Sequence, residues 1–167
     1  MHIGGDFGIR GAIVTSQGPV VFRNAQIDGS LILKNTKFQS DKGVDGEQMS
    51  VSQDVSLSNL KFAGVAHFQR CSIGHQLDVE GCSFDATDNA ADFSSVSTQD
   101  DFLVSSCTFS GGTSWDYIHA RGLYFSHHTS FARPIRFAGL IVDRSMSLET
   151  MVVSSGVSVE NSHIPRI

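Results

Sequence analysis

The stretch from Val51 to Phe84 constrains the fold most, because one hydrophobic pattern occurs in it three times and restarts at every eleventh position. Each copy begins with a large apolar residue. Three variable residues then lead to an apolar-x-apolar pair, and four more lead to the large apolar residue that opens the next copy. The first copy consists of Val51, Val55, Leu57 and Phe62. Self-similarity at a fixed period indicates a repeat architecture.

A second, subtler apolar position lies three residues after each pair and two residues before the next large residue. It holds small or apolar side chains and never a charged one: Ala25, Thr36, Leu60, Cys71, Cys82, Val96, Cys107, Leu140 and Met151. Each repeat unit therefore contains two small-x-large pairs, and its charged residues fall between them. This is the distribution expected when alternate side chains of a short strand are buried.

The alternation is too short for an ordinary sandwich strand, and the helical period of 3.6 residues is absent. Gly and Asn at the polar corners favour very short strands joined by tight bends. Two units make a coil of about 22 residues with four short faces. The sequence thus predicts an all-β fold, a single-stranded, four-sided parallel β-helix (β-solenoid) of about seven coils. At a rise of about 4.8 Å per coil, its length would be roughly 35 Å.

The pattern covers residues 1–167 as a single domain. Polar segments near residues 39–50 and 85–90 interrupt it and are predicted to be loop insertions. The stretch near residues 110–130 is predicted to be an irregular coil, because its apolar residues follow the pattern least well.

The small-x-large pairs carry a family resemblance. Pairs such as Ala25-x-Ile27, Cys71-x-Ile73 and Cys82-x-Phe84 resemble those of a degenerate pentapeptide-repeat protein, in which a small residue and a central Leu or Phe point inward. The resemblance implies a right-handed quadrilateral β-helix. Coils of about 22 residues are longer than four pentapeptides, and the Ala-Asp/Asn-Leu triplet of the strict family is scarce.

The sequence contains no pattern typical of an enzyme. Gly-rich phosphate loops, a serine elbow and spaced catalytic dyads are all absent, and the seven histidines lack metal-ligand spacing. The three cysteines occupy the inward position, where no His or acidic residue could activate them. We therefore expect reduced core thiols, no catalytic residue, no metal and no cofactor.

Charge is distributed unevenly along the chain. No Lys or Arg occurs between Arg70 and Arg121, whereas eight acidic residues do: Asp78, Glu80, Asp85, Asp88, Asp92, Asp100, Asp101 and Asp116. Because chain position corresponds to height on a solenoid, these residues predict an acidic belt at mid-rod. Some pentapeptide-repeat proteins are acidic rods that resemble duplex DNA and inhibit type II topoisomerases. The resemblance thus implies a DNA mimic as one alternative, and a solvated belt that keeps the rod soluble is the other.

Aromatic, histidine and arginine residues cluster in the irregular stretch. A rigid scaffold that displays such residues provides a candidate hot spot for binding. A second interpretation is equally open, in which the large aromatic residues fill a locally wider core. The candidate hot spot comprises Trp115, Tyr117, His119, Arg121, Tyr124, His127 and His128.

These observations favour a non-catalytic protein-interaction or structural scaffold module that stacks end to end or onto a neighbouring domain. The expected partner is another protein or a second copy. The net charge of −5 argues against direct nucleic-acid binding, and no apolar run is long enough for membrane insertion. A cytoplasmic protein is the default, with a secreted effector or a segment of a larger bacterial protein as alternatives. A weaker alternative is an ice-binding face formed by Ser72, Ser83, Ser97, Thr108 and Ser130.

Overall fold

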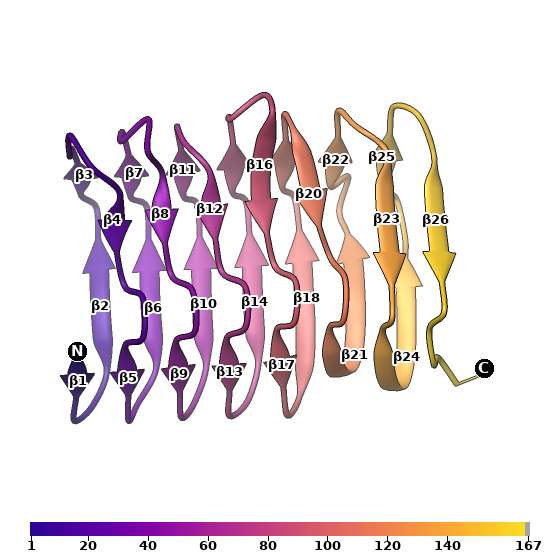
Figure 1. Ribbon diagram of the computed structural model, residues 1–167, viewed down its shortest axis with the longest axis horizontal. Helices are drawn as coiled ribbons and strands as arrows, with labels where there is room; N and C mark the ends of the chain where they lie inside the picture. The colour runs from indigo at the N-terminus through magenta and orange to yellow at the C-terminus, as the bar shows by residue number, and fades with distance from the viewer. Residues whose placement is uncertain (166–167) are drawn as a thin grey trace.

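The computed structural model describes residues 1–165, which form a right-handed parallel β-solenoid of about seven coils (Figure 1). The described residues contain no helix, and so none that is long and apolar enough to cross a membrane. The predicted all-β, four-sided β-helix is confirmed. Each coil has four sides, which we call A, B, C and D in chain order.

Sides A and B share one 12-stranded sheet, because two long strands run through both sides without a break. Side A comprises β1 (His2–Ile3), β5 (Gln26–Ile27), β9 (Ser50–Val51), β13 (Ser72–Ile73), β17 (Ser97–Thr98) and the first residues of β21 (His119–Ser126) and β24 (Ile141–Leu148). Side B comprises β2 (Phe7–Arg10), β6 (Leu31–Lys34), β10 (Val55–Ser58), β14 (Leu77–Glu80), β18 (Asp101–Ser105) and the remainder of β21 and β24.

Sides C and D are separate sheets. Side C comprises β3 (Ile13–Val14), β7 (Lys37–Phe38), β11 (Lys61–Phe62), β15 (Ser83–Phe84), β19 (Thr108–Phe109), β22 (Ser130–Phe131) and β25 (Val152–Val153). Side D comprises β4 (Val20–Val21), β8 (Val44–Asp45), β12 (Ala66–His67), β16 (Asn89–Asp92) and β20 (Gly112–Ser114), followed by the pair β23 (Ile135–Ala138) and β26 (Val157–Glu160).

The strand register gives the length of each coil. Equivalent residues on side A are 24, 24, 22, 25, 22, 22 and 22 positions apart along the chain. The longer coils carry their extra residues in the same place, the corner between sides C and D, at residues 15–19, 39–43 and 85–90. The first polar insertion is therefore shorter than the predicted 39–50, because Val44 already returns to the core.

Stacked aromatic rings fill the interior. Along side C the rings of Phe38, Phe62, Phe84, Phe109 and Phe131 stack with centroids 4.6–5.3 Å apart and planes within 11° of parallel. A second stack on side D contains Phe68, Phe93 and Trp115. The two stacks meet edge to face at Phe84–Phe93, with planes at 81°. Offset stacking and edge contacts are the favourable geometries for aromatic pairs, so the repeated Phe position aligns the coils.

Two opposite corners each use a residue with positive φ in nearly every coil. At the corner between sides B and C these residues are Gly11, Asn35, Asn59, Gly81, Ser106, His127, His128 and Thr150. At the corner between sides D and A they are Asn24, Gln48, Arg70, Ser95, Tyr117, Gly139 and Asn161. Left-handed backbone suits Gly and Asn best, which explains the Gly and Asn residues at these two corners.

Residues 110–130 follow the repeat more closely than the sequence suggests. Their apolar side chains are buried at inward positions, namely Trp115, Ile118, Ala120, Leu123 and Phe125. The irregularity is a shift of one residue on side B. There Phe102 pairs with Leu123, which lies 21 positions further along the chain. On side A, Ser97 pairs with His119, which lies 22 positions further along.

The corner between sides B and C restores the register with one additional residue, so that Thr108 and Ser130 on side C again have the spacing found on side A. His127 and His128 both have positive φ at that corner. The expected irregular coil is thus a compensated local shift.

Removing one ring from the side C stack should destabilise the whole rod. We expect Phe84→Ala to lower the free energy of unfolding by about 3 to 5 kcal/mol, because the cavity would lie between two stacked neighbours. Urea denaturation followed by far-UV circular dichroism measures this loss. Thr108→Ala, on the outward face of side C, should change stability by less than about 0.5 kcal/mol. Equal losses in the two variants would contradict the register.

Candidate interaction surfaces

The three cysteines are unsuited to chemistry. Each thiol is buried and donates a hydrogen bond to a main-chain carbonyl of the preceding coil, Cys71 to Gly46 at 3.1 Å and Cys82 to Leu57 at 3.3 Å. Burial raises the pKa of Cys71 to about 12. The interaction with the neighbouring Cys107 thiol, together with burial, also raises the pKa of Cys82. Neutral thiols of this kind are poor nucleophiles.

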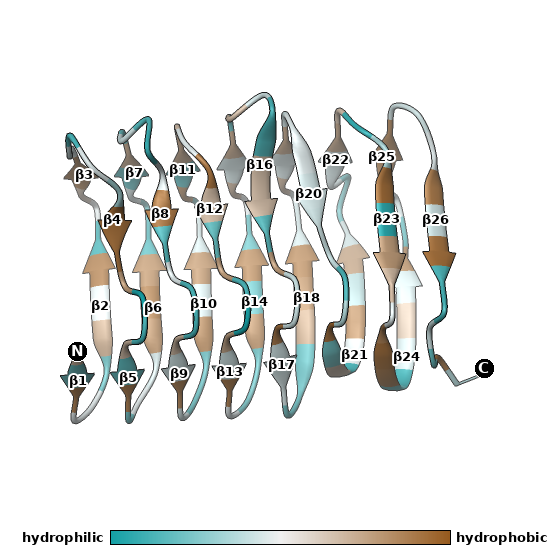
Figure 2. Cartoon of the chain, in the orientation of Figure 1, coloured by the Kyte–Doolittle hydropathy of each residue, from teal (hydrophilic) through white to brown (hydrophobic). Residues whose placement is uncertain are grey.

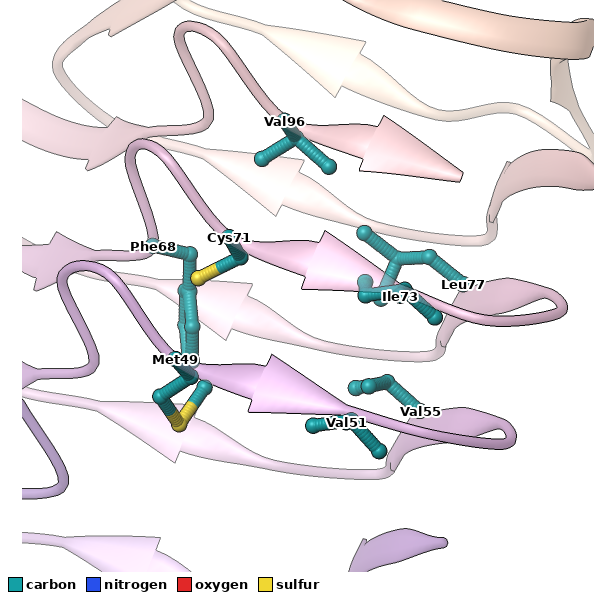
Figure 3. A pocket seen from close by; sticks show the side chains of 8 residues that line it. All are labelled: Met49, Val51, Val55, Phe68, Cys71, Ile73, Leu77 and Val96. Carbon is teal, nitrogen blue, oxygen red and sulfur yellow. The ribbon is translucent and has the colours of Figure 1, made fainter. Parts of the chain in front are cut away.

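The interior also offers no room for a ligand. A small cavity lies on side A between Met49, Phe68 and Cys71 and has a volume of about 10 Å³ (Figure 3). The lining is entirely apolar, so the cavity would not hold even one ordered water. No group of three His, Cys, Asp or Glu side chains among residues 1–165 is placed to bind a metal ion.

The structure does not bring the seven candidate hot-spot residues to one surface. Trp115 has no exposed area, and its indole N–H donates to the Thr113 hydroxyl at 2.8 Å. Trp115 also contacts the rings of Phe93 and Phe109. It therefore belongs to the core, in agreement with the interpretation that large aromatic residues fill the interior here.

The other six candidate hot-spot residues are spread around the sixth coil, because the chain turns three corners between them. Tyr117 is 67% exposed at the corner between sides D and A, and its ring covers Gly139 of the next coil. His119 lies on side A and Tyr124 on side B, where its hydroxyl lies 2.6 Å from Ser145 Oγ. The remaining three lie at corners: Arg121 between sides A and B, and His127 and His128 between sides B and C.

The eight residues of the acidic belt surround the rod. Asp78, Glu80 and Asp101 lie on side B, Asp92 and Asp116 lie on or next to side D, and the other three occupy corners: Asp85, Asp88 and Asp100. Three of the eight pair with basic residues of adjacent coils: Asp85 with Lys61 at 3.1 Å, Asp100 with Arg121 at 3.3 Å and Asp116 with Arg136 at 3.1 Å. The belt is thus partly neutralised and faces several directions.

Side D carries ion pairs that sequence reasoning missed. Arg23 lies 2.8 Å from Asp45 and 3.3 Å from Glu47, and Arg70 lies 3.0 Å from Glu47. Arg136 bridges Asp116 and Glu160. The partners lie on adjacent coils, so finding them from the sequence requires the length of every coil. The arginines are about half exposed, whereas Asp45 and Glu47 are largely buried.

Side B, in contrast, carries charges without partners. Arg10 and Lys34 are adjacent in register, and neither forms an ion pair with any described residue. Asp78 and Glu80, two coils further along, likewise have none within the described part of the chain. Burial and the neighbouring Glu80 raise the pKa of Asp78, and the positive charge of Lys34 opposes this shift.

The final coil exposes residues that are buried in the coils before it. Val157 and Val159 of β26 are 45% and 46% exposed, whereas their partners in β23, Ile135 and Phe137, are buried. Figure 2 shows the alternating hydrophobic residues of β26 at the end of the rod. The corresponding residues of the first coil, including Ile3, Phe7 and Ile9, are only half-buried.

The residues of the suggested ice-binding face lie on two different sides. Ser72 and Ser97 are aligned on side A, and Ser83, Thr108 and Ser130 form a column on side C. Two short columns on separate sides do not make one flat face.

Comparisons with protein-family models, curated protein sequences and solved structures find no match to this chain. The geometry itself assigns the chain to the β-helix repeat architecture.

The environment of Asp78 predicts an effect of pH on stability. The pKa of Asp78 is raised above 3.8 in the folded state. At neutral pH the charged carboxylate therefore lowers the stability of the folded protein. Below pH 3.8 the carboxyl group is protonated in both the folded and the unfolded state, and this loss of stability disappears. We expect Asp78→Asn to raise the melting temperature near neutral pH and to have no effect in acid. Asp88→Asn, in an exposed corner loop, is the matched control. An Asp78→Asn variant that melts lower than the wild type near neutral pH would contradict this account.

Proposed function

We propose that this protein is a non-catalytic scaffold that binds another protein or a second copy through the C-terminal end of the rod. The supporting observation is the exposure of inward residues in the final coil. Leu148, Val157 and Val159 occupy positions that are fully buried one coil earlier. Exposed apolar residues gathered at one end of the rod are typical of interaction sites.

The strand edges at this end strengthen the proposal. β25 pairs only with β22, and β26 pairs only with β23, so one edge of each strand has no strand partner among the described residues. Unpaired strand edges accept additional strands from other chains. A partner that adds a coil would bury the apolar residues and satisfy the main-chain groups together.

We further infer kinship with pentapeptide-repeat proteins. Support comes from the four-sided, right-handed coil and from the inward small-x-large pairs. The four sides are unequal, however, because side B strands span four residues or more and most strands of sides A and C span two. Such a relationship would favour a binding role over catalysis.

The acidic belt gives weaker support to DNA mimicry. Its carboxylates point in several directions, and three of them are paired with basic side chains. A duplex-like surface would present its charges in continuous rows along one side of the rod.

Replacing the exposed valines should abolish association through this end. We expect sedimentation at about 0.5 M salt, where exposed charges are screened, to show wild-type mass increasing with concentration. Val157→Lys with Val159→Glu keeps the net charge and should suppress this increase without loss of β structure. Ile141→Lys, at a position 47% exposed but facing outward on side A, should leave it unchanged. A wild-type protein that stays monomeric and binds no partner through these residues would refute the proposal.

A further inference from the structure

The unpaired charges of side B have an order that makes this surface complementary to itself. Arg10 and Lys34 lie on the first two coils, and Glu80 lies in the same outward column on the fourth. Like charges adjacent in register destabilise a sheet. Neither group forms an ion pair with a described residue, so a second molecule can provide the partner.

The spacing of these charges is symmetric about the third coil. Ser58 lies between Lys34 and Glu80 in the column, one coil from each. Consider a second copy that faces side B and is related to the first by a two-fold axis crossing the rod at the third coil. Lys34 of each copy then faces Glu80 of the other, and one contact produces two identical ion pairs. This is the self-complementarity that a two-fold interface requires.

The shape of side B allows such an approach. The outward residues of the third coil are Ser56 and Ser58, which are small, and the equivalent of Ser56 on the first coil is Gly8. Ile32, Asp78 and Leu103 in that column are only half-buried and would be covered. All three loop insertions lie at the corner between sides C and D, away from this face. Two such faces can therefore pack at the usual distance of about 10 Å between sheets.

We propose that side B is a self-association surface on which two copies pack antiparallel, with Lys34 of each against Glu80 of the other. A second copy fits better than a polyanion, because the positive group is followed on the same face by a negative one. This proposal does not depend on the function of the C-terminal end.

The test is a charge-reversal cycle in the Val157→Lys, Val159→Glu background, which removes association through the end. Sedimentation equilibrium at about 0.02 M salt should show a dimer with a dissociation constant in the micromolar range, which should weaken as salt rises. Lys34→Glu and Glu80→Lys should each raise the dissociation constant at least about tenfold, because each creates two like-charge contacts. The double variant should return to within about threefold of the starting value.

Lys42→Glu, which makes the same change of charge at the corner between sides C and D, is the matched control and should leave the dimer intact. Far-UV circular dichroism checks that every variant is folded. A background protein that stays monomeric overturns the proposal, and heparin binding by that monomer would assign the cations to a polyanion instead. Failure of the double variant to restore the dimer also overturns it, and neither result affects the test of the C-terminal end.

Discussion

The structure depends on the in-register stacking of each coil on its neighbour. Parallel strands of only a few residues are too short to be stable alone, so every coil gains its main-chain hydrogen bonds and its buried apolar area from adjacent coils. The side C phenylalanines, stacked 4.6–5.3 Å apart, match the strand spacing closely. Identical residues at identical positions therefore specify the register, and the corners and loops adapt to it.

The sequence predicts this architecture because stacking imposes a repeated pattern on the buried residues. Phe62 and Phe84 are inward in the sequence pattern and in the structure alike. The pattern fails where the number of residues in a corner changes while the type of buried residue stays the same. Between Ala120 and Leu123 the corner has one residue fewer than its equivalents, and the corner containing His127 and His128 has one more. Two compensating changes of one residue are invisible to a search for a fixed spacing.

Candidate surfaces are harder to predict than the core, because they depend on exact coil lengths. The pairing of Arg23 with Asp45 requires one of the lengthened coils, and that of Arg136 with Asp116 joins two adjacent coils on side D. The acidic belt is evident in the sequence, but its distribution over the sides is not. Trp115 illustrates the same difficulty, since an aromatic residue in an irregular stretch is compatible with a surface or with the core.

The fluorescence of Trp115 tests the proposed register most directly, because it is the only tryptophan in the chain. With no exposed area and phenylalanine rings around it, its emission should be strongly blue-shifted and resistant to quenching by acrylamide in the folded protein. Urea should shift the emission to the red in the same transition that removes the β-sheet signal. A red, readily quenched emission from the folded protein would place Trp115 on the surface and contradict the stacked-coil register of residues 110–130.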